Sequence, residues 1–351
     1  MNPSHATNAS TTPIAEAMTP TSTMLNLLAG CWVSRALSVA AKLGIADLLR
    51  DGPLACSSLA NATRTHEGSL YRVMRALASV EVFAEDERRR FRLTPLAEQL
   101  KTNAPGSLRD FAIMLGEKEH WRSWEGMLHS VNTGQPAFDH IFGQSHFSYF
   151  EQHPEATRIF DAAMTSRSEI ENQAIVAAYD FFRFDTVVEV GGGQGSLLQA
   201  ILAISPDTEG VLFDQPHVIA TARSLWDDGE GLLRCHFRAG DFFSAVPSSG
   251  DLYIVKKVIH DWDDERARQI LSNCRKAMSA EGRLLLIEPV IPARNQPSFN
   301  KLLDLLMLVW TSGGLERTEA EHRVLLESAD FDLLRVIPTG SGVSLLEAKP
   351  V

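Results

Sequence analysis

The sequence contains little cysteine. Its four cysteines, Cys31, Cys56, Cys235 and Cys274, lie far apart in 351 residues and form no C-x-x-C pair. Their spacing excludes a disulfide framework and a cysteine-rich zinc site, and it favours a reducing compartment such as the cytoplasm. The sequence also lacks an H-E-x-x-H motif and any clustered set of histidine and cysteine residues. We therefore expect a protein without a metal centre.

Positive charge is also scarce. Lysine and arginine together number 33 against 44 acidic residues, so the formal net charge is −11. Such a balance excludes a nucleic-acid or anionic-membrane partner held by bulk charge. The first basic residue is Arg35, which leaves no basic segment for a signal peptide. Because Arg35 and Lys42 interrupt the apolar stretch that begins at Met24, no bilayer span is predicted, and a soluble, cytoplasmic protein is expected.

The N-terminal region divides into two parts. Residues 1–21 are rich in Ser, Thr, Pro, Ala and Asn, and too few apolar groups are present to offset the entropy of ordering, so a flexible tail is predicted. From Met24 to Leu49 apolar residues recur densely at helical spacing. This wide apolar stripe is typical of a buried core helix, and it also suits packing against a second subunit.

A compact helix and strand pattern follows. Ser57 and Ser58 are predicted to cap a short helix, and a second helix is predicted over 67–79. Val82–Ala84 and Arg92–Thr94 can pair as strands around the charged turn EDERRR. Together these elements predict a winged-helix unit, whose usual function would be DNA binding. Acidic residues here nearly balance the arginines, which disfavours DNA and leaves a ligand-sensing regulator as an alternative.

The next segment, residues 102–180, is predicted to be helical and is unusually aromatic. Flat side chains suit a pocket for a flat ligand, although core packing is an equal alternative for each one. The candidate pocket residues, including two from a helix predicted over 301–310, are Trp121, Trp124, Phe142, Met164, Met307 and Trp310.

After Phe184 strands alternate with helices, which predicts an α/β domain with a doubly wound parallel sheet. The closing runs Leu333–Pro338 and Val343–Ala348 are joined by a TGSG turn, so they are predicted to form an antiparallel hairpin at the sheet edge. The other predicted strands are 186–190, 211–213, 235–239, 252–255 and 283–287, and the predicted helices are 196–204, 218–224, 265–278, 301–310 and 319–328.

The first strand of this sheet runs into a glycine loop, VVEVGGGQGS, with Glu189, Gly191, Gly193 and Gly195 in the spacing E-x-G-x-G-x-G. Glycines between a strand and a helix allow a ligand to approach the backbone at the helix N-terminus. The dinucleotide fingerprint G-x-G-x-x-G would need Gly or Ala where Ser196 stands. The spacing therefore suits a ligand without a pyrophosphate, such as S-adenosylmethionine.

Acidic residues also follow the next two strands. Asp214 follows the second strand in VLFDQPHVI, and Asp241 with Phe242 follows the third strand in AGDFF. An acid at the first place can accept both ribose hydroxyls, and the ring of Phe242 could cover an adenine. Each acid could alone be a helix cap. Because parallel strand ends meet at one edge, we expect a common ligand site there.

In combination, the segments VVEVGGGQG, FDQPHVI, GDFF, KKVIHDWDDE, LLLIEPVI and GGLERTEAE resemble the class I small-molecule O-methyltransferases. This family includes the plant caffeic-acid and acetylserotonin enzymes and bacterial enzymes that methylate carotenoid, polyketide or phenazine hydroxyls. The resemblance runs from about residue 22 to the C-terminus. It implies a Rossmann-like methyltransferase domain at 181–351, a winged-helix dimerisation domain at 22–101, a pocket region between them, and a homodimer.

The resemblance also implies roles for individual residues. Gly191 and its neighbours would line the loop that holds S-adenosylmethionine, and Asp214 would hold its ribose. Asp241 and Phe242 would meet the adenine, with Lys256 nearby. Glu189 stands where many members of the family have Asp.

His260 would be the general base of the reaction, flanked by Glu288 and Glu316. The chemistry agrees, because a phenol of pKa about 10 is a poor nucleophile at neutral pH and an imidazole of pKa about 6.5 can take its proton. A carboxylate beside the ring would orient it and stabilise the imidazolium. A histidine that only packs on the sheet edge is the alternative.

The expected activity is thus metal-independent methylation of a hydroxyl on a small aromatic or polyketide-like secondary metabolite. Some relatives bind S-adenosylmethionine and catalyse hydroxylation, decarboxylation or rearrangement instead, and this reaction class is kept as an alternative. Asp261, Asp263, Asp264 and Glu265 could suggest a magnesium site, but Asp263 or Asp264 as the cap of the following helix is favoured.

Overall fold

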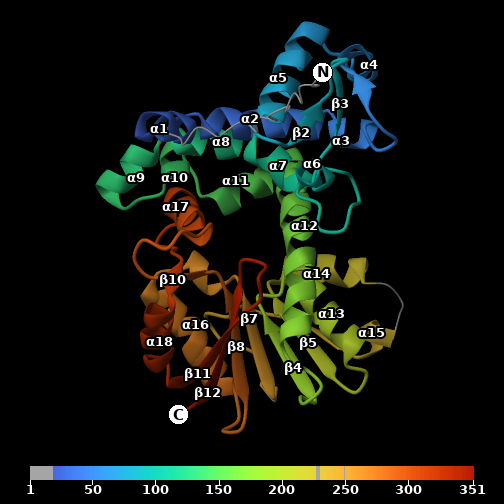
Figure 1. Cartoon of the computed structure of the whole chain (residues 1–351). Coiled ribbons are helices and arrows are strands. Elements are labelled where there is room, and N and C mark those ends of the chain that lie inside the picture. The colour runs from blue at the N-terminus through green and yellow to red at the C-terminus, as the bar shows by residue number, and fades with distance from the viewer. Residues whose placement is uncertain (1–18, 227–229, 249) are drawn as a thin grey trace, which may run out of the picture.

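The computed structural model describes residues 19–226, 230–248 and 250–351 (Figure 1). Most of the predicted tail lies outside these residues. Its last two residues already belong to α1 (Pro20–Leu28), because Thr19 accepts a hydrogen bond from the Ser22 amide at 3.1 Å and a proline occupies the first helical position. The helix therefore begins earlier than the composition predicts.

The long apolar stretch forms three helices, α1, α2 (Gly30–Lys42) and α3 (Ile45–Leu48), rather than one. None of the residues of α1 is buried. Among the described residues, no single helix is long and apolar enough to cross a membrane, whereas α1 and α2 taken together, with a bend of 43° between them, reach that length and composition.

A winged-helix unit follows, with α4 (Cys56–Thr63), α5 (Glu67–Ser79) and a small antiparallel sheet in the order β1-β3-β2. Ser57 and Ser58 do not cap α4, contrary to the prediction. Pairing of Ala55 with Arg90 ends β1 immediately before the helix, so Ala55 takes the cap position and both serines fall in the first turn. The strands are β1 (Leu54–Ala55), β2 (Phe83–Glu85) and β3 (Arg90–Leu93).

A helical layer lies between the winged-helix unit and the large sheet in Figure 1. Its last helix, α12 (Pro154–Ala178), is 25 residues long and runs from this layer down to the sheet domain, where it packs on α13. The other helices of the layer are α6 (Pro95–Glu98), α7 (Arg109–Leu115), α8 (Lys118–Glu125), α9 (Met127–Thr133), α10 (Ala137–Phe142) and α11 (His146–Gln152).

The large sheet has seven strands in the order β11-β12-β8-β7-β4-β5-β6. The five strands from β8 to β6 are parallel, and β12 pairs antiparallel with both β8 and β11, which confirms the predicted doubly wound sheet and its closing hairpin. The strands are β4 (Thr186–Val190), β5 (Glu209–Asp214), β6 (Cys235–Ala239), β7 (Leu252–Lys256), β8 (Arg283–Glu288), β11 (Phe331–Pro338) and β12 (Ser344–Pro350).

Helices cover both faces of this sheet and enclose two apolar cores. Neighbouring residues of β4 face opposite cores, since Val187 belongs to one and Val188 to the other, as strands buried on both faces require. The remaining elements are α13 (Ser196–Ile204), α14 (Pro216–Leu225), α15 (Glu230–Leu233), the 3₁₀ turn η1 (Ile259–Asp261), α16 (Asp264–Ala277), α17 (Asn300–Trp310) and α18 (Glu319–Glu327), with the two-residue strands β9 (Val290–Ile291) and β10 (Arg317–Thr318).

Candidate active site

The glycine loop joins β4 to α13 at the carboxyl edge of the sheet. Gly191 has φ +69°, and a Cβ there would lie 2.7 Å from the Val258 side chain, so glycine is required for both conformation and space. Gly193 also has a positive φ, but a Cβ on it would meet no atom within 4 Å. The loop therefore presents its backbone to open space, and this is a cradle that fits a ligand such as S-adenosylmethionine.

Two predicted cofactor-binding residues lie below this loop. Glu189 is buried and accepts a hydrogen bond from the Leu198 amide at 3.3 Å, in the first turn of α13. Burial raises its pKa to about 7, although the nearby ammonium group of Lys256 acts in the opposite direction. Lys256 lies 3.3 Å from Glu171 of α12 and donates a 2.7 Å hydrogen bond to Asn172, so α12 is tied to the end of β7.

The other predicted cofactor-binding residues lie around the same loop. Asp214 ends β5 and accepts a hydrogen bond from the Gly193 amide at 2.8 Å. The ring of Phe242 lies 3.6 Å from the position of a Gly191 Cβ, whereas Asp241 is exposed and accepts from the Phe243 amide at 2.9 Å. Gly195 is the N-cap residue of α13 in a left-handed conformation.

His260 lies in η1, directly after the end of β7. Its Nδ1 is 2.9 Å from Oε1 of Glu316, which comes from the loop after α17, 56 residues later in the chain. Both side chains are nearly fully buried. The geometry therefore brings these two residues together as the sequence predicts.

Glu288 lies close to this pair, but its hydrogen bonds go elsewhere. Its Oε1 accepts from the amides of Val258 (3.2 Å) and Ile259 (3.0 Å), so it holds the turn that carries His260. Ligand atoms of His260, Glu288 and Glu316 lie within 4.8 Å of one another, a spacing that a metal ion could also use. The hydrogen bonds already engage one oxygen of each carboxylate, and the absence of a metal stays a prediction.

The electrostatics of the site favour a protonated imidazole. Burial alone would lower the pKa of His260, but the carboxylates of Asp261, Glu288 and Glu316 outweigh this effect and raise the pKa to about 9. Burial also raises the pKa of Glu288 to about 7, against the opposing effect of His260. The imidazolium form is therefore well stabilised.

Arg317, which no sequence motif singled out, lies next to Glu316 in the chain and is only 1% exposed. Its guanidinium donates to Asp264 (2.8 Å) and to the carbonyl oxygens of Ile259 (3.2 Å) and Trp262 (2.9 Å). It therefore clamps the turn around His260 from the strand that follows Glu316. Asp263, the neighbour of Asp264, caps α16 by accepting from the Arg266 amide at 2.9 Å, as predicted.

A cavity of about 350 Å³ connects the glycine loop to His260. Its described lining includes Glu189, Gly191, Gly193, Lys256 and His260, so these predicted residues share one site. The predicted pocket residues Met164, Met307 and Trp310 also line it, as do residues that the sequence did not single out, among them Phe111, Met114, His146, Phe160, Arg167 and Leu306.

Three predicted pocket residues do not line this cavity. Trp124 and Phe142 pack in the apolar cluster around Phe138 and Trp310, and the guanidinium of Arg35 lies 5.5 Å from the ring centroid of Trp121. The sequence could not separate them from true lining residues. Which aromatic ring faces the cavity and which packs behind it depends on how each helix is oriented in the folded protein.

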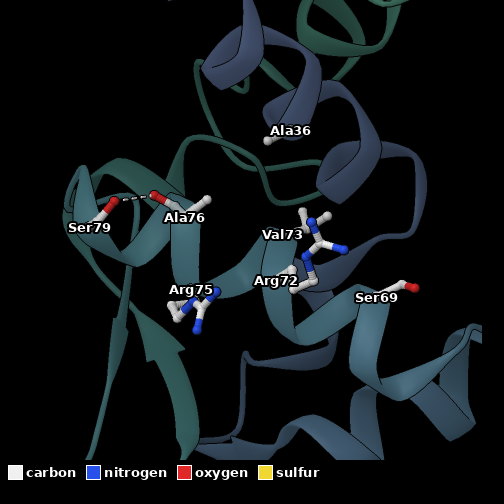
Figure 2. Close-up of a pocket in the computed structure, with 7 residues that line it drawn as sticks. All are labelled: Ala36, Ser69, Arg72, Val73, Arg75, Ala76 and Ser79. Atoms are coloured by element: carbon white, nitrogen blue, oxygen red, sulfur yellow. Dashed lines mark hydrogen bonds between the residues drawn. The ribbon is translucent and has the colours of Figure 1, made fainter. Parts of the chain in front are cut away.

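A second hollow, larger but open, lies on the winged-helix unit (Figure 2). It is formed by one side of α5 and by Ala36 of α2, and its charged groups are Arg72 and Arg75. None of the strand-end carboxylates or glycines contributes to it. The hollow is therefore separate from the candidate active site.

Comparison with known proteins agrees with this geometry. A family model described as the O-methyltransferase domain matches residues 124–332, and one described as the O-methyltransferase dimerisation domain matches residues 25–103. The chain is 47% identical to a phenazine O-methyltransferase of Lysobacter antibioticus over 96% of this chain and 98% of that protein. It is 39% identical to a mitomycin biosynthesis 6-O-methyltransferase of Streptomyces lavendulae over 91% of each chain.

A solved structure gives the same result at the level of the fold. The methyltransferase CalO1 of calicheamicin biosynthesis, in its S-adenosylhomocysteine-bound form, superimposes with a TM-score of 0.86 and 34% sequence identity. The match covers 95% of this chain and 100% of that one. Both parts of the present chain, the helical N-terminal part and the sheet domain, therefore have counterparts in one known protein.

Proposed function

Because the chain belongs to the S-adenosylmethionine-dependent O-methyltransferases of secondary metabolism, we propose that it methylates a hydroxyl group of a small aromatic compound, with His260 as the general base. The observation that carries this proposal is that His260, which is hydrogen-bonded to Glu316 behind it, lines the same cavity as the glycine loop. A base and a cofactor cradle that share one cavity are what methyl transfer to a hydroxyl needs.

The residues present fit the cofactor. S-adenosylmethionine supplies a methyl group on a positively charged sulfonium. We assign its binding to the backbone of Gly191 and Gly193, with Asp214 for the ribose hydroxyls and Phe242 for the adenine ring. Asp214 already accepts the Gly193 amide with one oxygen and the Gln215 amide with the other, and each carboxylate oxygen keeps a further lone pair.

His260 would act on the acceptor hydroxyl through Nε2, because Nδ1 is engaged with Glu316. The carboxylate holds the ring in one orientation and stabilises the imidazolium that forms when the proton is taken. A positive charge bound in the cavity lowers the pKa of His260 from its value of about 9, because two like charges disfavour each other. Binding of the cofactor would therefore favour the neutral form of the base.

The acceptor is proposed to be flat and aromatic. The cavity walls are formed largely by aromatic and aliphatic side chains, including Phe111, Phe160, Met307 and Trp310. The relatives named for phenazine and mitomycin also act on compounds of secondary metabolism. A volume of about 350 Å³ is enough for a small ring system.

The test is methyl transfer by the purified protein from S-adenosylmethionine to a panel of phenols, read by mass spectrometry. We expect His260→Ala to lower kcat by roughly 100- to 10,000-fold, the usual contribution of a general base. His236→Ala is the matched control, since His236 is an exposed histidine on β6, and it should keep wild-type activity. Treatment with EDTA should leave the rate unchanged. Full activity in His260→Ala would remove the proposed base.

We also propose that the chain acts as a homodimer through its N-terminal helices. The dimerisation domain supports this proposal, and so does α1, whose apolar side chains are not buried by the described residues of one chain. Nucleic acid is not proposed as a partner, because the net charge of −11 opposes it.

A further inference from the structure

Two aromatic N–H groups in the wall of the cavity have no hydrogen-bond partner among the residues that the structure describes. They are Nδ1 of His120, from α8, and Nε1 of Trp310, at the end of α17. His120 is 7% exposed and Trp310 is 5% exposed, and both line the cavity that holds His260. Their ring centroids are 5.7 Å apart, so the two rings lie next to each other in the cavity wall.

The tautomer of His120 follows from its neighbour. Trp124 donates its indole N–H to Nε2 of His120 at 3.0 Å, and an indole nitrogen can only donate. Nε2 therefore accepts, and a neutral imidazole must carry its proton on Nδ1. Burial lowers the pKa of His120 to about 4, so the ring is neutral at physiological pH. Within the described residues, its Nδ1–H group has no acceptor.

Such donors are costly unless a ligand or water accepts from them. A buried N–H group without a partner is energetically unfavourable, and most buried polar groups in proteins are satisfied. The indole N–H of Trp310 has the same need, because it too is a donor only. The cavity therefore contains two unused donors and an apolar surrounding that includes Phe111, Met114 and Leu306.

The charge around this pair is close to neutral. Burial lowers the pKa of His146, the other histidine near Trp310, so that ring also tends to be uncharged. Three cationic residues in the cavity wall, Arg167, Lys256 and Lys257, all pair with the buried Glu171. The fourth, His260, pairs with Glu316. An anionic ligand group beside His120 would therefore find no unpaired cation in the described wall and would be costly to bury.

We propose that His120 and Trp310 form a donor subsite that recognises an uncharged lone-pair atom on the methyl-accepting compound, a carbonyl oxygen or an aromatic ring nitrogen. The proposal rests on the proposed function, because it takes this cavity to be the binding place of the acceptor. His120 is a specificity-determining residue in this arrangement, and Trp124 is a positioning residue that acts by fixing its tautomer. The favoured acceptors carry a hydroxyl and, elsewhere on the same ring system, a lone-pair atom that donates no hydrogen bond.

The test compares tricyclic phenols that differ in this atom. The probes are 1-hydroxyphenazine, with ring nitrogens, 1-hydroxyanthraquinone, with carbonyl oxygens, and 1-hydroxyanthracene, which has neither. Binding to the protein loaded with S-adenosylhomocysteine is measured by calorimetry, and kcat/KM is measured with S-adenosylmethionine. We expect at least one of the first two probes to be preferred about 10-fold or more over 1-hydroxyanthracene in both measurements, as expected when donors built for a ligand atom are left unpaired.

The variants separate recognition from structure. His120→Phe and Trp310→Phe should each reduce this preference to within about threefold, mainly by weakening binding of the preferred probe. Trp124→Phe should reduce it less, because the imidazole can then redistribute its proton between the nitrogens. His236→Phe, at an exposed histidine on β6, is the matched control and should leave the preference unchanged. A loss of stability alone would lower activity on all probes alike.

The outcomes are distinguishable from failure of the proposed function. Preferential binding without methyl transfer supports the donor subsite and contradicts the proposed reaction on these compounds. Equal binding of all three probes to the wild-type protein, or a preference that survives in His120→Phe, overturns the subsite even if all three are methylated. If none of the probes binds, the subsite is also overturned for tricyclic phenols.

Discussion

His260 must accept a proton and must also be neutral before it does so. In the free protein, three neighbouring carboxylates raise the pKa of this ring to about 9 against the effect of burial. The protonated form is therefore favoured, and the neutral form that can accept a proton is scarce at neutral pH. A base is active in its neutral form, so the rate with the free enzyme should rise with pH toward this value. The carboxylates around His260 therefore set the pH range in which the enzyme should be active.

Glu316→Gln tests this link. Loss of one negative charge should move the midpoint of the kcat/KM profile toward acid by about one pH unit or more. The plateau of kcat should fall roughly 100-fold, because the imidazolium loses its counter-ion. Glu319→Gln, an exposed acid three residues away, is the control and should change neither quantity. A midpoint that stays at the wild-type pH in Glu316→Gln would contradict the role of Glu316.

At the scale of elements, the site depends on a turn that is held from two sides. Glu288 at the end of β8 accepts the first amides of η1, and Arg317 in β10 donates to two carbonyl oxygens of the same turn. Strand β10 pairs in parallel with β9, which begins two residues after Glu288. The backbone segments that carry Glu288 and Arg317 therefore lie side by side. His260 is therefore positioned by elements far away in the sequence.

Arg317→Lys should expose this dependence. Lysine keeps the charge but cannot donate in a fork to Asp264 and to two carbonyl oxygens at once. We expect a loss of roughly 2–4 kcal/mol in the free energy of unfolding, with a lower kcat, because buried carbonyl groups lose their donor. Denaturant unfolding measures the loss. Arg268→Lys on the exposed side of α16 should stay within about 0.5 kcal/mol of wild type, and an equally small loss in Arg317→Lys would disprove the clamp.

At the scale of the whole molecule, one surface is too apolar for an isolated chain. Leu27 and Leu28 of α1 are 71% and 67% exposed, and Trp32 of α2 is 74% exposed. Contiguous apolar surface of this kind marks an interaction site. The dimerisation domain includes all three residues, so the second chain is the partner that we propose for this surface.

Leu28→Glu combined with Trp32→Ser should therefore weaken self-association. We expect the dissociation constant of the dimer to rise roughly 100-fold or more, since buried aromatic anchors often contribute 2 kcal/mol or more each. Light scattering coupled to size exclusion measures the mass in solution. Val324→Glu is the control, because this valine is also exposed, at 65%, but lies on α18. A double variant with wild-type mass would rule out this surface.

Local sequence patterns predict several elements of this fold. The glycine loop, the strands that alternate with helices and the TGSG hairpin were all predictable, because backbone conformation at glycine and the period of apolar residues act over a few positions. Even so, the boundaries moved where strand pairing intervened. At Ala55 a partner strand sets the start of α4, which no serine-capping rule could show.

The sequence by itself determined the alternating strands and helices and the glycine loop, because short motifs carry these features, whereas the placing of Glu288 and Glu316 beside His260 was implied by the family resemblance. Only the tertiary structure decided which aromatic residues face the cavity, that Trp124 lies behind it, and that His120 is left with an unused donor. It also decided that Glu288 holds the backbone of η1 while Glu316 holds the ring of His260. These outcomes depend on the direction in which each side chain points after distant segments pack together, and that direction is not encoded in residue type or spacing.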